Sequence, residues 1–137
     1  MTTKIAIITF LILICFGCSE SKDQNSNENK TSQKTKLPSG KEIKINNIGG
    51  MKFENGETAL VLNYETDISI ENLEELKKEV TEVWKTFRYD VEREKTTFGI
   101  IRASHFEGSG FYRKGKGYGF IFKKGEDGNW ELDDKKF

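Results

Sequence analysis

The pattern of hydrophobic and polar residues divides this chain of 137 residues into three regions. Residues 5–16 are apolar except for Thr9, residues 19–36 contain no apolar residue, and the two kinds are interleaved in the remainder. The apolar run follows one positive charge, at Lys4, and is shorter than the roughly 20 residues that a membrane-spanning helix needs. Such a run is typical of a secretory signal peptide. We therefore expect residues 1–17 to be removed during export.

The junction at the end of the apolar run, Gly17-Cys18, resembles the lipobox of bacterial lipoproteins. In that family the cysteine is acylated and becomes the first residue of the mature chain, so the resemblance implies lipidation of Cys18 with chains such as palmitate and anchoring in the cell envelope. Cys15 stands where the family usually has an aliphatic residue. Ser19 resembles an outer-membrane sorting signal, which favours the outer over the inner membrane in a Gram-negative cell. An uncleaved anchor and ordinary secretion are the alternatives.

The polar region from residue 19 to residue 36 predicts a tether between the membrane and a folded domain. A segment without apolar residues cannot bury enough surface to offset the entropy lost on ordering. Pro38, the only proline, and Gly40 mark its end. The remainder has the length of one domain. We therefore expect three parts, namely a signal peptide over 1–17, a lipid-anchored flexible tether over 18–39, and a single domain over 40–137.

From residue 41 the pattern predicts a series of β-strands. Ile43 and Ile45 alternate with polar residues, as in a half-buried strand. Asn55-Gly56 is a strong hairpin signal and precedes an apolar return strand over 58–64. Further strand patterns follow at 96–106, 111–122 and 130–132.

One amphipathic helix is predicted between the first and second groups of strands. Apolar residues recur at helical spacing from Ile70 to Val91, Ser69 suits the N-cap, and Trp84 and Phe87 are expected in the core. This order predicts an α+β fold, in which one long helix crosses one face of a mostly antiparallel sheet of about five strands. The stretch 67–92 looks similar to uncharacterised small bacterial α+β domains, a resemblance that implies no function.

The composition offers few residues for catalysis or metal binding. Twenty-two basic and 22 acidic side chains balance, which gives no reason to expect a nucleic-acid partner. Of the two cysteines, Cys15 would leave with the signal peptide and Cys18 would be acylated. No nearby motif marks a nucleophile for His105, the only histidine. We therefore expect no catalytic residue, no cofactor and no metal site.

Two basic motifs in the C-terminal half have alternative interpretations. Residues 116–123 match seven of eight positions of the third-strand signature of the RNA-recognition motif, but Lys123 replaces the last aromatic residue. We interpret them as an ordinary strand. Arg113, Lys114 and Lys116 are interpreted as a solvated strand edge, and contact with an anionic headgroup or polysaccharide is the alternative.

The segment from Phe111 to Trp130 is rich in aromatic residues. Because one helix can cover only one face of the sheet, an uncovered aromatic face would mark a partner surface. The residues expected to form it are Tyr118, Phe120, Phe122 and Trp130. The sequence therefore predicts a membrane-anchored lipoprotein that acts as a non-catalytic binding or envelope-accessory module for a protein or envelope component. An envelope-located enzyme and an inhibitor or immunity-type lipoprotein are the alternatives.

Overall fold

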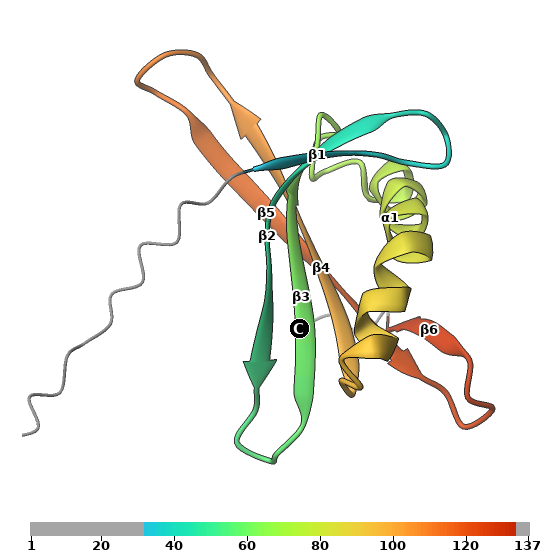
Figure 1. The fold of residues 1–137 in the computed structure, drawn as a ribbon. Helices are drawn as coiled ribbons and strands as arrows, with labels where there is room; N and C mark the ends of the chain where they lie inside the picture. Colours follow the sequence, from blue (N-terminus) through green and yellow to red (C-terminus); the bar gives the residue numbers. More distant parts are fainter. Residues whose placement is uncertain (1–31, 134–137) are drawn as a thin grey trace, which may run out of the picture.

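Six strands lie side by side in chain order in residues 32–133, the part of the chain that the computed structural model describes (Figure 1). The elements are β1 (Gln33–Lys36), β2 (Glu42–Lys52), β3 (Thr58–Glu65), α1 (Leu73–Arg93), β4 (Phe98–Glu107), β5 (Lys114–Lys124) and β6 (Trp130–Asp133). Strands β3 and β4 are parallel, because α1 connects them, and the other neighbours are antiparallel. The α+β class and the mostly antiparallel sheet agree with the sequence prediction, but the sheet has six strands rather than five.

The additional strand is β1, which lies within the segment predicted to be a tether. It pairs with β2 from Gln33 opposite Ile45 to Lys36 opposite Glu42. Leu37 is buried in the core, and Gly40 closes the turn with a φ of 90°. The ordered domain therefore begins before the predicted boundary at residue 40. The predicted signal peptide, Cys18 and the tether as far as residue 31 lie outside the described residues.

The N-cap of helix α1 lies three residues after Ser69, the residue that the sequence predicted as the cap. The side chain of Asn72 accepts a hydrogen bond from the Glu75 amide and is the N-cap. Ser69 instead closes a preceding turn, in which its carbonyl oxygen accepts from the Asn72 amide at 2.9 Å. Serine and asparagine are both favoured N-cap residues, so the local sequence alone did not decide between Ser69 and Asn72.

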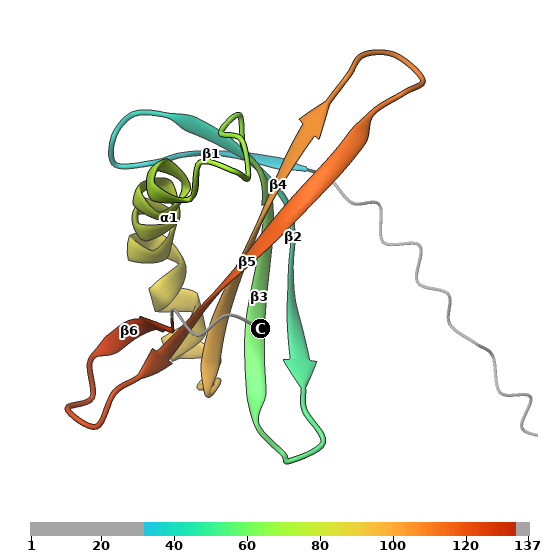
Figure 2. The same ribbon diagram turned by 180° about the vertical axis from the view of Figure 1, so that it is seen from behind.

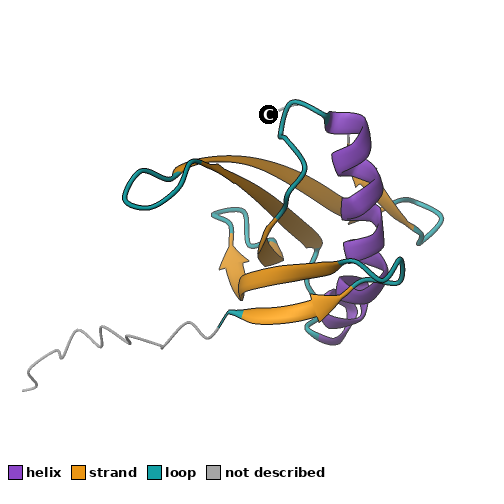
Figure 3. Ribbon diagram, turned by 90° about the horizontal axis from the view of Figure 1, so that it is seen from above, coloured by secondary structure: helices purple, strands orange, loops and turns teal. Residues whose placement is uncertain are grey.

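The main core lies between α1 and one face of the sheet (Figure 3). Trp84 is buried there, and its indole stacks on the Phe122 ring with 4.1 Å between centroids and 2° between planes. Phe87 is buried beside it, as predicted. Strand β4 has Gly99 directly beneath the indole, where a Cβ atom would lie 2.4 Å from the Trp84 ring. The glycine therefore permits the close approach of helix and sheet.

A buried carboxylate ties the helix to two strands. Glu79 Oε1 accepts hydrogen bonds from the Tyr64 hydroxyl at 3.0 Å and from Thr66 Oγ1 at 2.6 Å. Its second oxygen forms an ion pair with Lys41, the residue before β2. Burial and the nearby Glu79 raise the pKa of Tyr64 far above its usual value. These partners satisfy a charge that would otherwise be costly to bury.

Candidate functional site

No described element covers the sheet face opposite α1 (Figures 2 and 3). Apolar side chains nevertheless lie on this face. Side chains from the three central strands and β2 form a second hydrophobic cluster there, namely Met51, Ala59, Val61, Phe98, Ile100 and Ile121. A sheet face that meets only water normally carries polar side chains. The apolar character of this face therefore requires another explanation.

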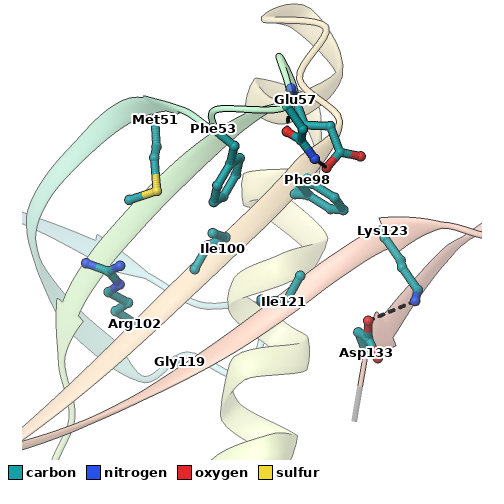
Figure 4. A pocket seen from close by; sticks show the side chains of 11 residues that line it. Met51, Phe53, Glu57, Phe98, Ile100, Arg102, Gly119, Ile121, Lys123 and Asp133 are labelled. Atoms are coloured by element: carbon teal, nitrogen blue, oxygen red, sulfur yellow. Dashed lines mark hydrogen bonds and ion pairs between the residues drawn. The ribbon is translucent and has the colours of Figure 1, made fainter. Parts of the chain in front are cut away.

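The apolar side chains form the floor of a hollow of about 590 Å³, which we call the open-face hollow (Figure 4). Phe53, from the β2–β3 hairpin, meets Phe98 edge to face with 6.0 Å between ring centroids. Ile100 and Ile121 lie on the adjacent strands β4 and β5, where Ile100 pairs with Ile121 in register. A volume of this size falls within the range of ligand-binding sites in proteins, about 300–1,000 Å³.

Polar groups lie around this apolar floor. Lys123 Nζ and Asp133 Oδ2 form an ion pair at 2.8 Å. In the hairpin, the Glu57 amide donates to Asn55 Oδ1 at 3.0 Å, which fixes the turn around Gly56. Arg102 is exposed, and its guanidinium forms no ion pair with a described residue. Among the described residues, the hollow thus combines an apolar floor with the unpaired cation of Arg102.

The four residues that the sequence marked as a partner surface lie on the other face, towards α1. Phe120 and Phe122 are 3% and 4% exposed, so both belong to the core and neither is available to a partner. Tyr118 and Trp130 are partly buried against the same core. The prediction that Phe120 and Phe122 belong to a partner surface is therefore corrected. Side chains alternate along β5, so the residues that face the hollow are Gly119, Ile121 and Lys123.

Sequence reasoning missed the residues of the open-face hollow. A signal for them was present in the sequence, namely the runs of apolar residues in β3 and β4. Both strands have buried residues on both faces of the sheet. Such runs are typical of strands covered on both sides. The described residues contain one helix, α1, which can cover only one of those faces.

His105 lies outside the open-face hollow. Its Nδ1 atom is 3.0 Å from the Thr66 carbonyl oxygen, to which it donates, and its Nε2 atom is 4.0 Å from Glu107 Oε1. Within residues 32–133, no group of three or more His, Cys, Asp or Glu side chains is placed to hold a metal ion. The chemistry that the described hollow offers is therefore apolar contact with a nearby positive charge.

No protein-family model matches this chain, and no curated protein or solved structure is significantly similar to it. Among the described helices, none is both long enough and apolar enough to cross a membrane. The case for a function consequently rests on the residues of the hollow and on the N-terminal sequence.

Proposed function

We propose that this protein is a membrane-anchored bacterial lipoprotein whose domain is a non-catalytic binding module, with the open-face hollow as its binding site. The observation that carries the proposal is the apolar floor that no described element covers, in which Met51, Phe98 and Ile121 are only partly buried. Contiguous exposed apolar surface on a folded domain commonly marks an interaction site.

The shape of the hollow favours a protein segment as the ligand. Its lining comes from a single sheet face, the β2–β3 hairpin and the end of β6. A small-molecule site usually encloses most of its ligand, whereas a protein interface needs only complementary surfaces. The partner segment would place apolar side chains over Phe98 and Ile121 and an acidic group beside Arg102.

The position of His105 supports binding over catalysis. An enzyme that used this histidine would need it within reach of the substrate, but His105 and the neighbouring Glu107 do not line the hollow. An inhibitor or immunity-type lipoprotein would be one form of the proposed module, in which the partner is itself an enzyme or toxin.

The test is capture of partners from native membranes by the full-length protein. Met51→Glu places a charge on the floor of the hollow, and Arg102→Glu reverses the available cation. Ile48→Glu is the matched control, because Ile48 is 45% exposed on the same strand and pairs with Leu62 on the opposite face. We expect both hollow variants to lose a partner that the wild type and the control retain, with circular dichroism spectra unchanged. Retention of every captured protein by both hollow variants would contradict the proposal.

A further inference from the structure

The β4–β5 hairpin extends beyond the rest of the sheet (Figures 1 and 2). Strand β3 pairs with β4 only as far as Ser104, whereas β4 and β5 continue to pair with each other up to Glu107 and Lys114. The ring of Phe106 packs over Gly115, where a Cβ atom would lie 2.7 Å from it. The Arg113 guanidinium lies 4.8 Å from the centre of that ring. These contacts stiffen the hairpin below its tip.

The tip exposes two adjacent aromatic side chains, Phe111 and Tyr112. They are 105% and 89% exposed, more than any other large hydrophobic residue in the described part of the chain. The charged residues between positions 106 and 116 are Glu107, Arg113, Lys114 and Lys116, which leaves a net charge of +2. Lys116 is paired with Glu71 at 3.0 Å, but Arg113 and Lys114 form no ion pair with a described residue.

We propose that this tip docks on the surface of an anionic lipid bilayer. Phe111 and Tyr112 enter the interfacial layer, where aromatic side chains are favoured, and Arg113 and Lys114 contact anionic headgroups. A cation near such a surface strengthens binding about fivefold. An anionic bilayer offers an apolar layer for the two aromatic side chains and negative charge for the two cations.

The dimensions of the tip favour a bilayer over a protein partner. Two aromatic side chains bury about 150–250 Å² each. A stable protein interface needs about 800 Å² from each partner, which a projecting turn cannot supply alone. A bilayer requires no complementary shape, because lipids rearrange around an inserted side chain.

The described chain begins at the end of β1 nearer to this tip (Figure 1). If the N-terminal region is the lipid anchor proposed above, the anchor and the tip can reach the same membrane. The composition and exposure of the tip carry the inference independently of that anchor.

The experiment places a fluorescent reporter at the tip. Full-length protein carrying Phe111→Trp is reconstituted into vesicles of phosphatidylcholine, with or without phosphatidylglycerol, and quenching by lipids brominated in their acyl chains is measured. Tyr89→Trp is the matched control, because Tyr89 is 62% exposed on α1. The native Trp84 and Trp130 are common to both variants, so they contribute the same background.

We expect the tip reporter to shift to shorter wavelength and to be quenched at least about twice as strongly as the control in anionic vesicles. Adding Arg113→Gln and Lys114→Gln should return the quenching to the level of neutral vesicles. Equal quenching of the two reporters in anionic vesicles would overturn the proposal. The proposal would also be overturned if the wavelength shift increased with the density of protein on the vesicles while brominated lipids caused no quenching. The tip would then contact a second copy of the chain.

Discussion

Replacement of Trp84 should remove a buried side chain that joins α1 to strands β5 and β6. The indole is 7% exposed, stacks on Phe122, and meets Phe87 and Trp130 edge to face at 6.1 Å and 5.2 Å. Truncation of a buried aromatic residue to alanine costs ~3–5 kcal/mol. Each aromatic pair contributes ~0.5–1.5 kcal/mol beyond the buried area, which places Trp84→Ala at the upper end of that range. Domains are stable by only ~5–15 kcal/mol, so much of the stability would be lost.

A double-mutant cycle with Gly99 tests the geometry behind this estimate. Gly99→Ala forces a methyl group against the Trp84 ring and should destabilise the wild type by ~1–3 kcal/mol through overpacking. In a Trp84→Leu background the six-membered ring is absent, so the same methyl group should cost less, because the remaining close neighbour is Val91 Cγ2, 3.0 Å from the added Cβ atom. The difference between the two costs is the coupling energy of neighbouring residues.

The free energies of unfolding for the cycle are measured by urea titration of the detergent-solubilised full chain, followed by far-ultraviolet circular dichroism. This signal does not depend on the tryptophan that is replaced. If Gly99→Ala costs the same in both backgrounds, the indole does not lie over Gly99 and the packing argument is refuted.

Three further predictions concern single residues. Intact-mass analysis should find a chain that starts at Cys18 and carries acyl groups, and Cys18→Ser should leave the full-length precursor. Because the pKa of Tyr64 is raised in the folded state, its contribution to stability is complete below the unfolded value of about 10 and is lost as pH rises above it. Urea titrations should therefore give a stability that falls above about pH 10 less steeply in Tyr64→Phe than in the wild type. His105→Ala should cost ~0.5–1.5 kcal/mol by the same titration, since the histidine forms a hydrogen bond with the Thr66 carbonyl group; no loss at all would make that bond irrelevant to the fold.

Local signals in the sequence predicted the local elements well. Asn55-Gly56 forms the β2–β3 turn, with Gly56 at a φ of 88°. The apolar stripe of α1 is buried at the expected helical spacing. Such signals are reliable because the required backbone geometry, such as a positive φ, depends on the residues themselves.

Long-range features could not be predicted in this way. Strand β1 contains no apolar residue and is held by backbone pairing with β2, so its sequence carries no periodic signal. Alternation in β5 separates Phe120 and Phe122 from Gly119 and Ile121, but it does not say which set α1 covers. That choice depends on the packing of Trp84 over Gly99, two residues that lie on different elements. For this reason Phe120 and Phe122 were expected on a partner surface, although they lie in the core.

The treatment of the sheet edges strengthens the argument for a binding role of the open-face hollow. The edge strand β1 carries Lys34 and Lys36, and the opposite edge strand β6 is only four residues long. Charged and short edge strands hinder pairing between molecules. Exposed apolar surface also promotes aggregation, yet Phe98 and Ile121 remain only partly buried on the face that no described element covers. The combination of protected edges and an apolar face supports the proposal that the open-face hollow is a binding site.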